Sequence, residues 1–238
     1  MTLTGWLRYD RVGAFFPRGA VRVLEVGCGM GALGAILSSR YEYTGIEPDA
    51  QSFAVARERV VDGLVLNVGA EGFSGSDFDV VCAFEVLEHI EDDVAALRRW
   101  AAFARPGGTI VVSVPAGRER FGAADERVGH FRRYDLGDLV EVMLAAGLTA
   151  PVVAPYAFPL GYLLEGARGV LAQRSTVSVD PGERTAGSGR WLQPPRWFAL
   201  GSWAVAWPFR LAQRPVGVGT GLIAAAGVPA SPTVPSSV

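Results

Sequence analysis

The chain has 238 residues, of which half are hydrophobic and 19% are charged; this suffices for a domain with a sizeable core and excludes a largely disordered chain. Its net charge of −2 argues against a nucleic-acid partner, because such binders carry a basic face. The sequence has no lysine, which excludes a Schiff base and a Walker-type phosphate lysine. Two cysteines without a secretory signal predict reduced thiols in a cytoplasmic protein.

Short apolar segments alternate with helical segments through most of the chain. The predicted strands are 21–26, 43–47, 64–68, 78–84, 109–115, 149–156 and 217–227. The predicted helices are 31–39, 49–60, 92–104 and 135–147. This pattern predicts an α/β fold, a doubly wound Rossmann-like sheet of about seven strands with helices on both faces.

The same pattern predicts one domain over residues 1–238, with a cofactor-binding core at 20–150. The stretch 157–215 is longer than this fold needs and is predicted to be an apolar helical insert or cap. Within it, the polar segment 174–190 has loop composition and is predicted to be mobile. The end of the chain, 229–238, is predicted to be a disordered tail.

Tryptophans stand beside arginines in the second half of the insert. The apolar run 197–209 is too short to span a membrane, and Pro208 interrupts it. Two interpretations remain open for 191–214: helices packed on the sheet, or a peripheral contact with a membrane or a greasy substrate. The N-terminal segment 6–16 is predicted to add a helix to the same cap.

Three glycines stand at alternate positions directly after the first strand, in the segment VLEVGCGMGALG: Gly27, Gly29 and Gly31. Such a backbone lets a ligand approach closely and points helix N–H groups at an anion. Glu47 ends the second strand, where a carboxylate can bind the hydroxyls of a ribose. These features predict an adenosine-containing cofactor. Glu25, beside the loop, would repel a pyrophosphate but attract the ammonium group of a sulfonium cofactor.

Four motifs then follow in a recognisable order: VLEVGCGMG, GIEPD, FDVVCAFEVLEHI and RPGGTIVVSVP. Over roughly residues 20–150 the chain resembles the class I S-adenosylmethionine-dependent methyltransferases. The resemblance implies S-adenosyl-L-methionine as cofactor and a last strand inserted antiparallel beside the fifth. It implies a cofactor site made of Glu25, Gly27, Gly29, Gly31, Glu47, Pro48, Gly69, Ala70, Ala83 and Phe84. The family often has an adenine-binding aspartate after the third strand; here Gly69 stands in that place, which shifts this contact to the backbone.

The stretch FEVLEHI holds one of the two histidines of the chain. Glu85, Glu88 and His89 stand at i, i+3 and i+4, so one helical turn would present them on one face. The other histidine, His130, lies in a loop predicted to cover the same edge of the sheet. Two carboxylates and two imidazoles suit a divalent metal.

The arrangement resembles the metal-assisted O-methyltransferases of ubiquinone biosynthesis and the small-RNA 3′-terminal 2′-O-methyltransferases. This resemblance implies Mg²⁺ or another divalent metal held by Glu85, Glu88, His89 and His130. The alternative is a site without a metal, in which the glutamate caps the next helix and His89 or His130 is the general base. The predicted catalytic residues are Glu88, His89, His130 and Tyr134.

The loop RERFGAADERVGHFRRYD carries five arginines. We favour a solvated loop with internal ion pairs. The alternative is a lid whose Arg132 or Arg133 binds a carboxylate or phosphate on the substrate, with Tyr134 donating to the same group.

The sequence therefore predicts a methyltransferase that acts on a small, possibly lipid-like molecule, with oxygen as the favoured acceptor atom and no nucleic-acid partner. Two alternatives from other classes remain. One is a nicotinamide-dependent reductase that uses the same glycine loop. The other is a non-catalytic cofactor-binding protein that associates with a membrane.

Overall fold

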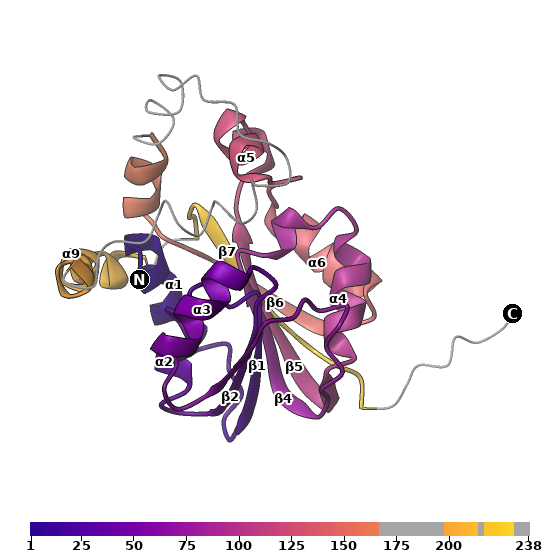
Figure 1. The fold of residues 1–238 in the computed structure, drawn as a ribbon. Helices are drawn as coiled ribbons and strands as arrows, with labels where there is room; N and C mark the ends of the chain where they lie inside the picture. The colour runs from indigo at the N-terminus through magenta and orange to yellow at the C-terminus, as the bar shows by residue number, and fades with distance from the viewer. Residues whose placement is uncertain (167–197, 214–216, 231–238) are drawn as a thin grey trace, which may run out of the picture.

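The computed structural model in Figure 1 describes residues 1–166, 198–213 and 217–230. The predicted mobile segment 174–190 and nearly all of the predicted tail 229–238 lie outside the described residues. Both cysteines are described, and both are buried and free. No helix among the described residues is long and apolar enough to cross a membrane.

Seven strands form a single sheet in the order β3-β2-β1-β4-β5-β7-β6. The strands are β1 (Arg22–Val26), β2 (Glu42–Ile46), β3 (Leu64–Leu66), β4 (Phe78–Phe84), β5 (Ala104–Pro115), β6 (Thr149–Tyr156) and β7 (Gly221–Gly227). The first five strands are parallel, whereas β7 is antiparallel to both of its neighbours, β5 and β6. The predicted Rossmann-like sheet with an antiparallel last strand is confirmed.

Helices cover both faces of this sheet. They are α1 (Leu3–Val12), α2 (Gly34–Leu37), α3 (Ala50–Arg59), α4 (Asp93–Ala101), α5 (Ala123–Val128), α6 (Leu136–Ala145) and α9 (Phe198–Ala212), with short 3₁₀ turns η1 (Leu87–His89) and η2 (Arg118–Arg120). Figure 1 shows α4 and α6 on one side and α1, α2, α3 and α9 on the other, while α5 stands beyond one end of the strands. Alternation along the strands divides the core accordingly: Leu24 packs with the α4 side and Val23 with the α1 side.

Local chemistry sets where several helices begin. Asp49 caps α3 by accepting the Ser52 N–H at 2.8 Å, and Asp92 caps α4 by accepting the Ala95 N–H at 2.9 Å. The helix predicted over 31–39 shortens to α2, because the left-handed φ of +69° at Gly31 prolongs the loop. The arginine-rich segment, predicted as a loop, contains η2 and α5.

The N-terminal helix α1 packs against α9, although some 200 residues separate them in the sequence. Trp6 donates its indole N–H to Ser202 at 3.1 Å, and Arg210 pairs with Asp10 at 2.6 Å. The buried amide of Gln213 joins the same contact by donating to the Leu7 carbonyl at 3.1 Å. One face of α9 is thus occupied by α1.

Candidate functional site

The glycine loop after β1 uses its three glycines in two ways. All three have left-handed φ angles, of +69° at Gly27, +54° at Gly29 and +69° at Gly31. A Cβ at Gly27 would lie 2.7 Å from a methyl of Val86, and one at Gly31 would lie 3.0 Å from the Ala56 Cα. A Cβ at Gly29 would meet nothing within 4 Å. Two of the glycines are therefore needed for packing, and the third borders open space.

Glu25, in β1, is a buried carboxyl group with one strong partner. It is 4% exposed, and the Tyr43 hydroxyl donates to it at 2.6 Å. Burial raises the pKa of Glu25 to about 7, against the opposing effects of the Tyr43 hydrogen bond and the charge of Arg8. The predicted negative charge beside the loop is therefore only partly present near neutral pH.

This raised pKa predicts how stability depends on pH. Glu25 contributes stability that is fully present below its ordinary pKa of 4.5 and is lost as pH rises through about 7. We expect a Glu25→Gln variant, which keeps an acceptor for Tyr43, to remove that loss, which is on the order of 3 kcal/mol. Urea unfolding of both proteins at pH 5, 7 and 9 measures this loss of unfolding free energy. Equal pH slopes for the variant and the wild type would contradict the assignment.

Glu47, at the end of β2, supports the glycine loop. One oxygen accepts the Gly29 N–H at 2.8 Å, and the other accepts the Asp49 N–H at 2.9 Å. Burial raises the pKa of this carboxyl, and the two hydrogen bonds oppose the rise. Each oxygen keeps a further lone pair, so the predicted contact with ribose hydroxyls is compatible with this geometry.

The ends of β2 and β3 lie together at the same edge of the sheet. Asn67 donates to the carbonyls of Glu47 at 2.8 Å and Pro48 at 3.1 Å. A Cβ at Gly69 would lie 3.8 Å from the Pro48 Cβ and 3.1 Å from a carboxylate oxygen of Glu71. Among the predicted cofactor residues, Pro48 and Gly69 are thus neighbours, with Ala70 next in the chain. Ala83 and Phe84 end β4 and are buried, at 1% and 6% exposure.

Glu85 does not join the group that the sequence predicted for it. Its φ is +59°, outside the helical region, and the 3₁₀ turn η1 begins only at Leu87. Its carboxylate accepts hydrogen bonds from Ser113 and Tyr156, both at 2.9 Å, and pairs with Arg8 at 3.3 Å. The four-residue metal set is corrected to three residues, because the helical turn assumed for Glu85, Glu88 and His89 does not include the first of them.

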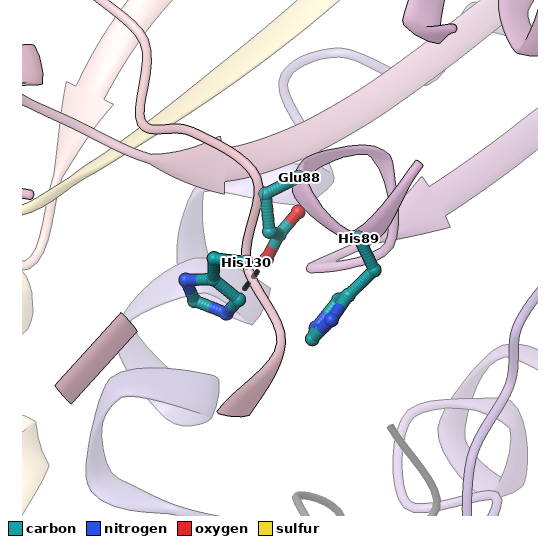
Figure 2. A group of neighbouring side chains, drawn as sticks. All are labelled: Glu88, His89 and His130. Carbon is teal, nitrogen blue, oxygen red and sulfur yellow. Dashed lines mark ion pairs between the residues drawn. The ribbon is translucent and has the colours of Figure 1, made fainter. Parts of the chain in front are cut away.

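Glu88, His89 and His130 converge from η1 and from the segment after α5 (Figure 2). One ligand atom from each of the three lies within 4.8 Å of the others. Glu88 is fully buried, and neither of its oxygens has a hydrogen-bond partner. His130 Nε2 lies 3.9 Å from one of these oxygens. Burial raises the pKa of Glu88 well above its usual range, and the nearby Glu85 adds to the rise.

The two imidazoles are each held through Nδ1. His130 Nδ1 lies 2.9 Å from an oxygen of Asp125, and His89 Nδ1 lies 3.3 Å from the Gly129 carbonyl. Because both oxygens are acceptors, Nδ1 is the donor in each neutral ring, and Nε2 keeps its lone pair. Burial and the neighbouring His130 lower the pKa of His89 to about 4, so His89 is neutral at pH 7. The Phe131 N–H donates to the Glu88 carbonyl at 2.8 Å and fastens the two segments together.

These three side chains fit the metal that the resemblance implied. A buried carboxyl group without a hydrogen-bond partner leaves its oxygens available to an ion, and ligating histidines characteristically donate their second N–H to an outer acceptor, as His130 does to Asp125. The same donor set also fits a site without a metal, in which a neutral imidazole accepts a proton. Sequence reasoning missed Asp125, since nothing in the pattern distinguishes this acid of α5 from its solvated neighbours.

Tyr134 and the paired arginines are placed elsewhere. Tyr134 is 2% exposed and donates its hydroxyl to Asp93 at 2.9 Å, so its predicted catalytic role is corrected to a structural one. Arg132 pairs with the same Asp93 at 2.6 Å. Arg133 pairs with Asp125 at 2.9 Å and with Glu165 at 2.8 Å. Of these pairs, only Arg133 with Asp125 lies within the segment; Asp93 and Glu165 lie outside it, and Arg133 is 10% exposed, so the solvated loop with internal ion pairs that we favoured describes the segment only in part.

A seven-stranded sheet of this order, with an acid in its first strand, a glycine loop after that strand and a second acid directly after β2, defines a Rossmann-like methyltransferase fold. A family model described as a methyltransferase domain matches residues 7–151, which is more than half of the chain. The chain belongs to this family of class I S-adenosylmethionine-dependent methyltransferases, and S-adenosylmethionine is its cofactor. This assignment excludes the nicotinamide-dependent alternative.

Two curated relatives illustrate the similarity in sequence. A ubiquinone biosynthesis O-methyltransferase of Aeromonas salmonicida is 33% identical over 112 residues, which cover 44% of this chain and 46% of that protein. An uncharacterized methyltransferase of Mycobacterium tuberculosis is 35% identical over 112 residues, which cover 44% and 57%. The chain thus spans about half the length of the curated relatives that it matches.

Solved structures share the fold at lower identity. A phosphoethanolamine N-methyltransferase of Haemonchus contortus in complex with S-adenosyl-L-methionine has a TM-score of 0.61 at 17% identity, covering 93% of this chain and 52% of that one. A methyltransferase of Thermotoga maritima has a TM-score of 0.59 at 18% identity, covering 94% and 89%. Both likenesses extend beyond the residues that the family model matches.

Proposed function

We propose that this protein transfers the methyl group of S-adenosylmethionine to a hydroxyl oxygen of a small-molecule acceptor. One observation carries the proposal: Glu88, His89 and His130 converge directly after β4, where the resemblance places the reacting methyl group. Two imidazoles with free Nε2 lone pairs, beside a buried carboxyl group, are suited to take a proton from a hydroxyl. The name of the Aeromonas relative, an O-methyltransferase, supports oxygen as the acceptor atom.

The reaction needs alignment and one proton acceptor. The hydroxyl oxygen forms a bond to the methyl carbon as the sulfur–carbon bond breaks, and S-adenosylhomocysteine leaves. The hydroxyl proton passes to an imidazole Nε2, for which His130 is the better candidate, because Asp125 on its Nδ1 stabilises the positive charge that results. The remaining work of the protein is to hold the reactants in line and to exclude water.

A divalent metal such as Mg²⁺ is the alternative to proton transfer to His130 in this proposal, because the single free lone pair on Nε2 cannot both bind an ion and take a proton. Glu88, His89 and His130 would hold it, and their burial and spacing fit such an ion. When bound, it would lower the pKa of the acceptor hydroxyl. Glu85 is left out of this set, because Ser113, Tyr156 and Arg8 engage its carboxylate.

A methylation screen tests the proposed function. Radiolabelled S-adenosylmethionine is offered with hydroxylated aromatics, sugars and prenyl lipids, with Mg²⁺ or with EDTA, and products are identified by mass spectrometry. We expect an O-methylated product. Activity that EDTA removes and Mg²⁺ restores would support the proposed metal site. Equal activity with Mg²⁺ and with EDTA would support direct proton transfer to the imidazole, without a metal. Transfer to nitrogen or carbon alone would overturn the proposal.

We also propose that α9 touches a membrane surface, which would suit a lipid-like acceptor. Trp203, Trp207 and Leu211 stand four residues apart, on one face of the helix, and are 41%, 50% and 57% exposed. Exposed tryptophans beside a leucine are typical of helices that lie in the membrane interface. The opposite face is occupied by α1.

A Trp203→Ser/Trp207→Ser variant is expected to bind vesicles at least about 30-fold more weakly than the wild type, since burial of each tryptophan contributes about 1–3 kcal/mol and 1.4 kcal/mol is a factor of ten. Co-sedimentation with vesicles of phosphatidylcholine and phosphatidylglycerol measures it. Val61→Ser, which removes a side chain 82% exposed and away from α9, is the matched control. If the wild type stays in the supernatant, the exposed face has another role.

A further inference from the structure

Asp125 holds His130 through two different contacts. It lies on α5 with 3% exposure, and its side-chain oxygen accepts from His130 Nδ1 at 2.9 Å. Its backbone carbonyl accepts the His130 N–H at 3.0 Å. The main chain and the ring of His130 are thus fixed by the same residue, five positions earlier in the sequence.

Asp125 is itself held in place by an arginine. Arg133, 10% exposed in its side chain, donates from Nε to the same oxygen at 2.9 Å. Its other end pairs with Glu165 at 2.8 Å, and Glu165 also pairs with Arg120 at 2.9 Å. Burial alone would raise the pKa of Asp125, but the hydrogen bonds from His130 and Arg133 outweigh it and lower the pKa. The side chain that holds the His130 ring is thus itself fixed by an ion pair.

We propose that Asp125 is a positioning residue that fixes the tautomer of His130, so that the Nε2 lone pair faces Glu88 and the acceptor site. Asp125 lies at the Nδ1 edge of the His130 ring, whereas Glu88 lies 3.9 Å from Nε2 on the other edge, so Asp125 reaches the acceptor site through the ring of His130. If its oxygen were absent, the neutral imidazole could carry its proton on Nε2, and no lone pair would then face Glu88. The consequence for catalysis rests on the proposed function, but the consequence for the tautomer does not.

The chain offers a closely matched control in Asp138. Asp125 and Asp138 both stand at the third position of a helix and accept the N–H of the residue before that helix, at 3.1 Å from Gly122 and 3.0 Å from Asp135. Each also pairs with an arginine, at 2.9 Å with Arg133 and 3.1 Å with Arg118. Only Asp125 contacts a histidine. Replacing Asp138 therefore reproduces the loss of a helix cap and an ion pair without touching His130.

The experiment reads the tautomer directly. The chain has only two histidines, so ¹⁵N spectra of the imidazole rings contain two ring systems, and a His89→Gln reference assigns them. Spectra are recorded at pH 9, above the ordinary imidazole pKa of about 6.5. We expect His130 to be protonated on Nδ1 in the wild type and in Asp138→Ala, and on Nε2 in Asp125→Ala. Asp125→Asn, which keeps an oxygen for Nδ1–H, is expected to restore the wild-type tautomer.

Kinetics with the acceptor from the screen then separate positioning from folding. Asp125→Ala is expected to lower kcat about 10- to 100-fold, with KM and the Kd for S-adenosylmethionine within about threefold of wild type. In a His130→Ala background, Asp125→Ala should cause no further loss, because it acts through the missing ring.

The outcomes are distinguishable. An unchanged tautomer in Asp125→Ala, or equal losses of kcat in Asp125→Ala and Asp138→Ala, would overturn the positioning role. A switched tautomer together with an unchanged kcat would support the assignment of Asp125 and overturn the proposed use of His130 in methyl transfer.

Discussion

A Glu88→Gln variant is expected to bind S-adenosylmethionine as the wild type does and to lose at least about 100-fold in kcat, the lower range for a group that handles a proton. Glutamine has the shape of the neutral acid and fills the same buried space. It cannot become a carboxylate, so it can neither exchange a proton nor supply negative charge to a metal. Both oxygens of Glu88 lack a partner among the described groups, and they lie next to His130. Replacing Glu88 by glutamine therefore removes an ionisable group but breaks few contacts.

The stability of the same variant distinguishes a functional residue from a structural one. Glutamine replaces a buried polar group that has no hydrogen-bond partner by another of the same shape, so Glu88→Gln is expected to have a Tm close to that of the wild type. Glu85→Gln is the matched contrast, three residues earlier. It weakens the pairing with Arg8 and two hydrogen bonds, and it is expected to cost about 1–2 kcal/mol of unfolding free energy.

We would measure cofactor binding by calorimetry, stability by thermal unfolding, and turnover for both variants. Together these measurements show whether Glu88 is the functional residue and Glu85 the structural one. The expected result is an inactive but stable Glu88→Gln and a less stable Glu85→Gln whose kcat stays within about tenfold of the wild type. If Glu88→Gln keeps kcat within threefold, the group around His130 is not the reaction site. If Glu85→Gln is the inactive one, the acceptor lies on the side of Arg8 and Tyr156.

The fold could be predicted because its signals are local and repeated. Apolar strands alternating with helices fix a parallel sheet, and the three glycines mark where its first strand ends. The meeting of Glu88 with His130, 42 positions later by their numbers, followed from topology, because the carboxyl ends of parallel strands share one edge of the sheet. That rule needs no knowledge of side-chain packing.

The errors arose where a side chain's direction depends on tertiary contacts. The spacing of Glu85, Glu88 and His89 assumed a helix, but the left-handed φ at Glu85 is uncommon for glutamate and has no sequence signal. Tyr134 was expected at the site because it follows two arginines, yet Asp93, from a distant helix, binds its hydroxyl in the core. Asp125 went unnoticed for the same reason. The contact between Asp125 and His130 depends on the tertiary placement of α5, which the sequence pattern does not specify.

Gly27→Ala and Gly29→Ala are expected to fail for different reasons. An alanine at either position pays for a left-handed φ, about 1–2 kcal/mol. At Gly27 the new methyl also meets Val86 at 2.7 Å, which adds about 1–3 kcal/mol of overpacking. Because Val86 precedes η1, this strain reaches the turn that carries Glu88 and His89. Urea unfolding should therefore rank Gly27→Ala well below Gly29→Ala in stability.

Cofactor affinity should not follow this order of stability: Gly29→Ala, the more stable variant, is expected to lose affinity for S-adenosylmethionine. The methyl of Gly29→Ala enters space that the described protein atoms leave open and that the cofactor is predicted to fill. We expect calorimetry to show at least about tenfold weaker binding of S-adenosylmethionine, despite a small loss of stability. In Gly27→Ala, adding Val86→Ala should restore part of the stability, because the coupling between these two positions is steric. Wild-type affinity in Gly29→Ala would mean that the cofactor does not approach the loop at its middle glycine, and the assignment of the loop would have to move toward Gly31 and the end of β2.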